Sequence, residues 1–586
     1  MPITDPDKNR NTMALPAKQQ SVSLITLCLM ALVVGSVTGL GAVTLRALIG
    51  LLHNLFFFGD FSFAYDANQL TPLSPWGPWI ILVPVIGGLG VVYLVKNFAP
   101  EARGHGVPEV MDAIYYREGR IRPMVVLIKS LASALSIGCG AAVGREGPII
   151  QIGSAIGSTI GQRWRLANWQ TITLVAAGAG AGIAATFNTP LGAVMFAVEL
   201  MLPEVSSRTF LPVVLATGAA TYVGRIFFGL QPAFLVPVMN LPDILLPTSF
   251  SFLPIYVLLG IICGFAAWAF VALLYRIEDM FEAIPGGPYV QSVIGMGAIG
   301  LLLYGLSISV GNYYVDGVGY GTIQAILTNS MTSVWLMGLL FVAKILATSI
   351  SLGAGASGGI FSPSLFIGAT LGGSFGALLA VLWPELGFNP VQFAIIGMAA
   401  IVGGSTGAAM TAIFMIFEMT ANYSVIVPGI IAVACAIGVR RTLSSENIYT
   451  LKLARRGHYV PKDRHTNMLL VRQASDVMQP ITSVMDITAD APGAAEPGYM
   501  LVTRGRHIVG VRSPGQSDGT DHGALHRRYV IAREKDIMTN VLNRMGERGR
   551  KYALVVRGEG IPHASNVIGV IGPSEVAAQM MKQFRS

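Results

Sequence analysis

Hydrophobic residues in this chain form long blocks rather than the short alternations that are typical of a soluble domain. From about Ser23 to Val439, apolar stretches follow one another with short polar loops between them. Many of these stretches are shorter than the roughly 20 residues that a spanning helix needs, and many are interrupted by Gly and Pro. After Arg440 the sequence becomes charged and polar, and from about Val471 strand-like and helix-like pieces alternate. The pattern predicts an all-α polytopic membrane region followed by a small α/β domain.

The domain boundaries follow from this change of pattern. The apolar run from about Ser23 to Leu52 is longer than a signal-peptide core of roughly 7–15 residues, so we expect an uncleaved first span. We predict an N-terminal arm over residues 1–22 and a membrane region over 23–455, with halves at about 23–230 and 250–440. The soluble domain is predicted over residues 456–586.

The membrane region contains an internal repeat. Lys129–Gly161 matches Lys344–Gly376 at a constant offset of 215 residues and without a gap. Beyond each copy follows a further matching segment, in which Glu199 aligns with Glu418. Short, glycine-interrupted segments at corresponding places in two halves are typical of transport proteins built from inverted repeats with broken helices.

Composition supports a membrane protein and excludes several other classes. The 586 residues are 53% hydrophobic and 12% charged, whereas soluble domains average about 25% charged residues. The net charge of +8 does not indicate nucleic-acid binding, because the basic residues lie in loops and in the tail, as the positive-inside bias requires. The four cysteines form no CxxC metal pair, and the eight histidines do not cluster. We expect no enzyme, no metal site and no required cofactor.

Loop charges predict the orientation. The connection from about His53 to Ser74 has no Lys or Arg, whereas the Arg103–Arg122 loop is basic, and the N-terminal arm carries Lys8, Arg10 and Lys18. The positive-inside bias places both basic segments in the cytoplasm. We therefore expect a multi-pass protein of the plasma (inner) membrane with both termini cytoplasmic.

Three glycine turns predict an anion site. Gly144–Pro148 and Gly359–Pro363 occupy corresponding places in the two copies, and Gly104–Pro108 is a third turn of the same kind. A Pro near the start of a helix fits its first turn, and free N–H groups with the positive end of the helix dipole attract anions. Glu146 places a carboxylate at one such helix start, while the mirrored turn has none. A carboxylate there could merely stabilise its helix by about 0.3–1 kcal/mol, but an ionisable group inside a membrane is a functional hypothesis.

These motifs resemble the CLC family of chloride channels and chloride/proton antiporters. GREGP at Gly144–Pro148, GxFxP at Gly359–Pro363, GxGxP at Gly104–Pro108 and Tyr449 in ENIYTLKLARRG carry the resemblance, which covers about Ser23–Arg455. It implies a homodimer in the lipid bilayer with one anion pathway per subunit.

The resemblance also implies roles for individual residues. Glu146 would be the gate and outer proton carrier, and Tyr449 would donate its hydroxyl to a central chloride beside the N–H groups of Ile360 and Phe361. Tyr449 could instead be an interfacial aromatic anchor. The residues implied at the anion site are His105, Gly106, Gly144, Arg145, Gly147, Gly359, Ile360, Phe361, Ser362 and Tyr449.

His105 is one departure from the family pattern, which usually has Ser at this place. A neutral imidazole can donate one N–H, and a protonated one adds a positive charge near the cytoplasmic mouth. His105 could equally turn away to cap a loop. The residue therefore leaves anion selectivity open.

Leu200 is the second departure. Proton-coupled members resemble NAPL…EE, and here Glu199 matches the first acid while Leu200 replaces the proton-transferring second one. Because Glu418 mirrors Glu199, we interpret Glu199 as structural, capping a neighbouring backbone. Water chains or His105 could replace the missing proton station.

The soluble tail resembles a degenerate pair of CBS modules, over Ala474–Val511 and Asp536–Glu575. Such pairs often bind adenine nucleotides, but the usual strand-end residues are poorly kept here. We favour a dimerisation or scaffolding role, with adenine nucleotide binding as the alternative.

The sequence thus predicts chloride transport gated by Glu146. Leu200 favours a passive, channel-like or weakly coupled conduit, and the alternative is a chloride/proton antiporter. A channel for neutral solutes is a more remote alternative, since it would need paired Asn-Pro-Ala boxes and only Asn188-Thr189-Pro190 comes near.

Overall fold

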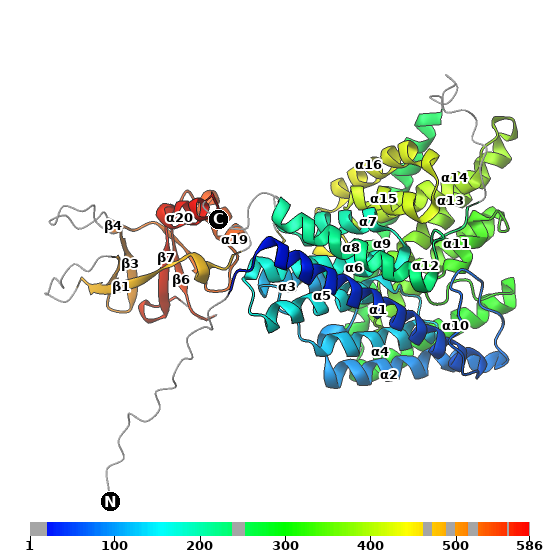
Figure 1. Ribbon diagram of the computed structural model, residues 1–586, viewed down its shortest axis with the longest axis horizontal. Coiled ribbons are helices and arrows are strands. Elements are labelled where there is room, and N and C mark those ends of the chain that lie inside the picture. Colours follow the sequence, from blue (N-terminus) through cyan, green and yellow to red (C-terminus); the bar gives the residue numbers. More distant parts are fainter. Residues whose placement is uncertain are drawn as a thin grey trace, which may run out of the picture.

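The computed structural model describes residues 20–236, 252–460, 472–487, 498–513, 525–558 and 562–584. Most of the predicted N-terminal arm, residues 1–19, lies outside the described residues. Helices fill the described chain up to Arg455, and a β-sheet with three helices follows at the opposite end of the long axis (Figure 1). The predicted fold class, a helical membrane region with a small sheet-containing domain, is confirmed.

Nine helical segments of the described chain are long and apolar enough to cross a membrane. They are α1 (Leu24–Phe58), α2 with its preceding turn (Gly77–Phe98), α6 (Asn168–Phe187), α8 (Ser207–Phe228), α9 (Leu253–Glu282), α10 (Gly287–Val310), α12 (Val334–Gly353), α13 (Phe361–Leu382) and α16 with its preceding turn (Tyr423–Leu443).

Shorter helices lie between these segments and after the last of them, as the broken apolar stretches predict. They are α3 (Val107–Tyr116), α4 (Met124–Gly138), α5 (Glu146–Arg163), α7 (Pro190–Phe196), α11 (Tyr320–Leu327), α14 (Pro390–Thr406), α15 (Ala409–Thr420) and α17 (Thr450–Arg455). A π-helical turn at Ala197–Met201 extends α7. Non-helical backbone inside a membrane must be buried or line an aqueous cavity. We therefore expect the functional site at the breaks between these helices.

The two halves repeat the same helix pairs. In the first half α5 packs along α6, and in the second α13 packs along α14. Glycines allow both approaches: a Cβ atom at Gly178 would lie 2.0 Å from the carbonyl oxygen of Gly153, and one at Gly397 would lie 2.4 Å from that of Gly368. Small residues let helix backbones approach closely in membranes. These contacts fix α5 and α13, which begin at the candidate site.

The C-terminal domain is a seven-stranded sheet in the order β4-β3-β2-β1-β7-β6-β5. Its strands are β1 (Gln479–Asp486), β2 (Tyr499–Arg504), β3 (His507–Arg512), β4 (Leu525–His526), β5 (Tyr529–Arg533), β6 (Tyr552–Val556) and β7 (Val567–Ile571). The helices are α18 (Ala474–Val477), α19 (Met538–Glu547) and α20 (Pro573–Phe584).

The sheet contains one strand pattern twice. β1 pairs in parallel with β2, which pairs antiparallel with β3; likewise β5 pairs in parallel with β6, which pairs antiparallel with β7. This arrangement is compatible with the predicted degenerate CBS pair. Within the C-terminal domain, the Tyr499 hydroxyl of β2 donates a hydrogen bond to Glu575 of α20 (2.8 Å). A second hydrogen bond connects this domain to the helical region, since Gln473 Nε2 donates to the carbonyl of Tyr116 in α3 (3.1 Å).

The glycine contact between α5 and α6 predicts a stability effect. Gly178→Ala should destabilise the protein by roughly 1–3 kcal/mol, because the added methyl group meets backbone that cannot move aside. Gly218→Ala on α8 is the matched control, since a Cβ atom there meets nothing within 4 Å. Thermal unfolding midpoints of the two variants in detergent test this, and equal midpoints would contradict the tight contact.

Candidate functional site

The two repeats join through their own glycine turns. Gly144 N–H donates to the carbonyl of Gly359 (2.7 Å), and Gly359 N–H donates to the carbonyl of Gly144 (2.6 Å). The third turn attaches to the same place, since Gly358 N–H donates to the carbonyl of Gly104 (3.3 Å). The structure therefore brings together the three turns that the sequence predicts to converge.

Side chains are excluded where the turns touch. A Cβ atom at Gly147 would lie 2.1 Å from the carbonyl oxygen of His105, and one at Gly106 would lie 2.8 Å from that of Gly147. Gly106 also has φ 81°, a conformation that favours glycine. The candidate residues Gly106, Gly144, Gly147 and Gly359 thus act through their missing side chains, which let backbones approach the site.

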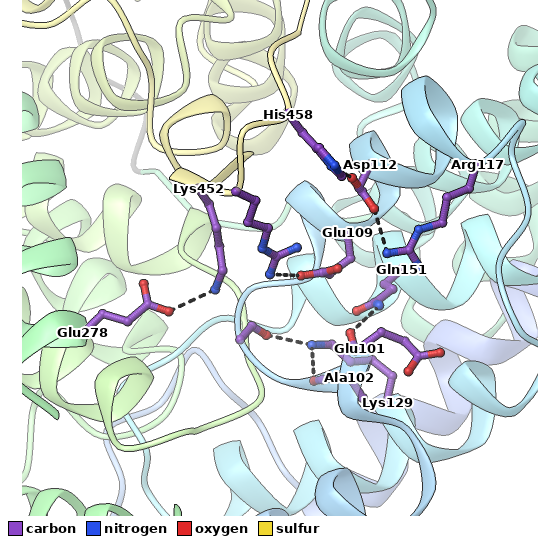
Figure 2. A network of polar contacts seen from close by, with 12 residues as sticks. Glu101, Ala102, Glu109, Asp112, Arg117, Lys129, Gln151, Glu278, Lys452 and His458 are labelled. Carbon is purple, nitrogen blue, oxygen red and sulfur yellow. Dashed lines mark hydrogen bonds and ion pairs between the residues drawn. The ribbon is translucent and has the colours of Figure 1, made fainter. Parts of the chain in front are cut away.

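Two buried lysines hold the turns in place, one in each repeat. Lys129 Nζ donates to the carbonyls of Ala102 (2.9 Å) and Gly104 (2.7 Å), as Figure 2 shows in part. Its mirror, Lys344, donates to the carbonyls of Val315 (2.8 Å) and Gly317 (3.0 Å). Both ammonium groups are fully buried. Lys129 and Lys344, which correspond in the two sequence repeats, therefore do the same thing in the structure: each donates hydrogen bonds to two backbone carbonyls of a neighbouring turn.

Glu146 links the halves at the point where α5 and α13 begin. Its Oε2 accepts a hydrogen bond from Ser362 N–H in the first turn of α13 (3.3 Å), and its Oε1 accepts one from the Tyr320 hydroxyl. The side chain is 1% exposed. A carboxylate that only stabilised its own helix would not reach the other half, so this geometry favours the functional interpretation of Glu146.

Tyr320 is a residue that the sequence analysis missed. Its hydroxyl contacts Glu146 and also lies 2.8 Å from Ser362 Oγ. The signal was present: Gly317-Val318-Gly319-Tyr320 repeats Gly104-His105-Gly106-Val107 at an offset of 213 residues. This fourth turn lacks the Pro of the others, and it opens α11 just as the Gly104 turn opens α3.

His105 and Tyr449 form the other end of the candidate site. Their ring centroids lie 6.3 Å apart, and both side chains are buried. Neither ring nitrogen of His105 has a hydrogen-bond partner among the described residues. His105 therefore does not cap a loop. Tyr449, at 1% exposure, does not lie at a membrane surface as an interfacial anchor would.

The backbone around Tyr449 explains its position. Asn447 Oδ1 accepts from the N–H groups of Tyr449 (2.9 Å) and Thr450 (2.8 Å), and the Tyr275 hydroxyl donates to the carbonyl of Ile448 (2.6 Å). These bonds begin α17 directly after Tyr449.

Ile360 and Phe361 lie at the start of α13, and both are buried. The first N–H groups of a helix lie outside its internal hydrogen-bond ladder, so both are placed to bind an anion. Arg145 precedes Glu146, and its Cζ lies 5.2 Å from the centroid of the Tyr320 ring.

A charged cavity of about 470 Å³ lies beside the His105 turn. Its lining contains the ion pairs Lys452–Glu278 (3.0 Å), Arg455–Asp279 (2.7 Å) and Arg456–Glu109 (2.6 Å). Figure 2 shows the Lys452–Glu278 pair approaching the turn that Lys129 holds. We call this the inner cavity.

The neighbouring loop is fixed by a further ion pair. Arg122 donates two hydrogen bonds of 2.5 Å to Glu101. Burial acts to raise the pKa of Glu101, but these bonds outweigh it and hold that pKa below its usual value.

Glu199 and Glu418 cap one another's helices. Glu199 accepts hydrogen bonds from the N–H groups of Met410 (3.0 Å) and Thr411 (2.7 Å) at the start of α15, and from the Thr411 hydroxyl. Glu418 accepts from the N–H groups of Leu191 (3.1 Å) and Gly192 (2.8 Å) at the start of α7. The capping that the sequence predicts for Glu199 is thus present. Leu200 is buried and apolar beside it.

These features define a membrane transport protein with two inverted repeats and a buried site between broken helices. Residues 87–441 match the family described as voltage gated chloride channel. The H(+)/Cl(-) exchange transporter ClcA of Salmonella paratyphi B is 34% identical over 445 residues, covering 75% of this chain and 90% of that transporter. ClcA of Salmonella schwarzengrund is 33% identical over the same span. The chain therefore belongs to the CLC family.

Solved structures agree with this assignment. A slow cyanobacterial Cl-/H+ antiporter matches with a TM-score of 0.63 and 28% identity, covering 75% of this chain and 99% of that one. A eukaryotic CLC transporter matches with a TM-score of 0.61 and 19% identity, covering 94% of this chain and 98% of the other. At that identity the second match shows the fold alone, and its coverage extends into the C-terminal sheet.

The reciprocal caps separate two roles for Glu199. Glu199→Ala should lower stability by about 0.5–2 kcal/mol through the lost cap, as should Glu418→Ala. Glu199→Gln retains an acceptor oxygen but no titratable group, so if Glu199 is only a helix cap, the variant should transport chloride, and any protons, as the unmodified protein does. Thermal unfolding and proton flux in liposomes measure these effects. Loss of proton flux in a stable Glu199→Gln variant would instead make Glu199 a proton carrier.

Proposed function

We propose that this protein exchanges chloride for protons across the membrane. The two ClcA relatives are named H(+)/Cl(-) exchange transporters and the cyanobacterial protein a Cl-/H+ antiporter, and they support this alternative better than the passive conduit that the sequence analysis favoured. Neither they nor the family match support a channel for neutral solutes. The observation that carries the proposal is the position of Glu146, which reaches from one half of the protein to the helix start of the other (3.3 Å to Ser362 N–H).

Glu146 would act as both gate and proton carrier. The ionised carboxylate occupies the helix starts where a permeating anion would bind, and the Tyr320 hydroxyl and Ser362 N–H stabilise it there. Protonation removes the charge, which weakens its hold on this place and frees it for chloride. The ionised carboxylate and chloride thus compete for one location, and because protonation removes the carboxylate from this competition, it links proton movement to chloride movement.

The central chloride would lie between His105, Tyr449 and the start of α13. A buried donor without a partner is costly, and an anion beside His105 would satisfy one ring N–H. The Tyr449 hydroxyl and the N–H groups of Ile360 and Phe361 would complete the donor set. All of these groups are hydrogen-bond donors, as an anion site requires.

The inner proton route differs from the family pattern at Leu200. Leucine cannot carry a proton, and Glu199 is engaged as a helix cap. We propose that protons enter through water in the inner cavity, whose lining includes Glu109, Glu278 and Glu282 beside the His105 turn.

The remaining parts of the proposal concern assembly and location. Two copies would assemble in the inner membrane, each with its own pathway and with both termini in the cytoplasm. Adenine nucleotide binding by the C-terminal sheet stays a prediction, as does its role in dimerisation.

Glu146→Gln tests the gate. The variant mimics the protonated side chain, so chloride flux should persist or rise, lose its dependence on pH, and no longer drive protons. Purified protein in chloride-loaded liposomes allows chloride efflux and external pH to be recorded together. Glu385→Gln is the matched control, because Glu385 is an exposed carboxylate in the short 3-10 helix Pro384–Leu386 that follows α13.

The same recording with the unmodified protein tests the exchange itself. Protons driven uphill by chloride flow are expected. Chloride efflux without proton movement would contradict exchange and restore the passive conduit. Unchanged proton coupling in Glu146→Gln would contradict the gate assignment.

His105 can be tested as an anion ligand. His105→Leu removes both nitrogens, and loss of a hydrogen bond to a charged group costs about 1.5–3 kcal/mol, so the half-saturating chloride concentration should rise at least about tenfold. His105→Ser restores a donor and should recover much of that loss. Chloride binding measured by calorimetry on detergent-solubilised protein decides this, and equal affinities for the three proteins would remove His105 from the site.

A further inference from the structure

A second cavity, of about 180 Å³, adjoins Glu146, since it is lined by Arg145, which precedes Glu146 in the chain, and by Tyr320, which donates a hydrogen bond to Glu146. Its lining comes from α1, from the ends of α6 and α8, and from the loop that follows α8. Ala67 and Asn68 also line it. They belong to the loop without Lys or Arg that the positive-inside bias places outside the cytoplasm. We call this the outer cavity.

Three arginines line the outer cavity at increasing depth. Arg225 is exposed, Arg46 is half-buried, and Arg145 is only 9% exposed. The lining contains no acidic side chain, and none of the three forms an ion pair among the described residues. The exposure therefore falls along a row of positive charges that leads from solvent toward the buried Tyr320.

The contacts of the three arginines within the described residues leave some of their N–H groups without a hydrogen-bond acceptor. Arg225 Nε donates to Asn188 Oδ1 (2.7 Å), and Arg46 Cζ lies 4.5 Å from the centroid of the Phe228 ring. Arg145 stacks over Tyr320, and its Nε is buried without a partner among the described residues. An unpartnered guanidinium nitrogen at this depth points to a missing anion.

Asp66 is the acidic residue to consider as a competitor, because its charge acts on Arg46. Its carboxylate, however, accepts hydrogen bonds from Asn68 N–H (3.0 Å) and Gln69 Nε2 (3.3 Å), and it does not line the cavity. Asp66 therefore does not neutralise the three arginines within the cavity.

Size and charge together define the ligand. At about 30 Å³ per water, the cavity has room for roughly six waters, enough for a small anion with part of its hydration shell. Three guanidinium groups in a partly desolvated space repel one another, and a bound anion offsets that repulsion. Guanidinium groups offer only donors, so they attract anions and not cations.

We propose that the outer cavity is an anion-binding site that holds chloride outside the closed Glu146 gate. The site rests on the proposed function, because its occupant is the transported ion. Tyr320 lines the cavity and also donates to Glu146, so the bound chloride lies next to the side chain that holds the gate. When Glu146 is protonated and leaves the helix starts, this chloride is the first to enter.

The test measures the two sides of the membrane separately. In membrane vesicles of one orientation, the chloride concentration that gives half-maximal exchange is measured from the outer side and from the inner side. Arg46→Gln with Arg225→Gln should raise the ratio of outer to inner values by roughly three- to tenfold. Arg208→Gln is the matched control, since it removes an exposed arginine at the other end of α8.

A direct readout keeps the proposal falsifiable if the double variant folds poorly. Bromide replaces chloride in crystals of the full chain, and its anomalous signal is expected in the outer cavity near Arg145. Absence of that signal would contradict the proposed anion site. So would an unchanged ratio of outer to inner half-maximal chloride concentrations in a double variant with normal thermal stability.

The outcomes also separate this site from the proposed exchange. If chloride moves without protons, the proposal of chloride/proton exchange is wrong. The ratio of outer to inner half-maximal chloride concentrations and the bromide signal still test whether the outer cavity binds an anion. If exchange is intact and the ratio is unchanged, the outer site alone is wrong.

Discussion

The pair of hydrogen bonds between Gly144 and Gly359 is the constraint on which the membrane region depends. Broken helices leave backbone N–H and C=O groups unpaired, and a membrane offers no water to satisfy them. Here each repeat satisfies the break in the other, at 2.7 and 2.6 Å. Because the pairing is antiparallel, α5 and α13 begin at one place and direct their dipoles toward it. Lys129 and Lys344 then fix the adjoining turns, so the helix starts that supply backbone donors to the proposed anion site are held in place.

The residues to which the proposed function assigns the gate lie where the two repeats differ. Glu146 corresponds to Phe361, and Val107 corresponds to Tyr320, so the carboxylate comes from one half and the hydroxyl that holds it comes from the other. Glu199 and Glu418 show the opposite case, because both halves keep the acid and each uses it to cap a helix. These paired acids stabilise the fold, whereas the proposed gate is a carboxylate that only one half carries.

The sequence predicts those parts of this structure that are local or repeated. The glycine turns at Gly104, Gly144 and Gly359 are local signals, and the correspondence of the halves is readable from their alignment. Contacts across the halves are not, because an alignment pairs Lys129 with Lys344 but says nothing of what either touches. Tyr320 was missed for this reason: its turn has no Pro, and its partner Glu146 lies 174 residues away. That the ring nitrogens of His105 have no hydrogen-bond partner within the described part of the chain likewise depends on tertiary packing.

Leucine at position 200 does not by itself argue against coupling. Linkage between protonation and chloride binding requires only that the ionised carboxylate and chloride compete for one place, and in the proposed function Glu146 at the shared helix starts provides that competition. An acid near Leu200 would supply protons to Glu146 and so set the rate of its protonation from the inner side. Without such an acid, water must carry protons over a longer path from the inner cavity to Glu146. Under the proposed function we therefore expect this longer path to slow exchange without opening a passive flow, because an unprotonated Glu146 would keep the pathway closed to chloride.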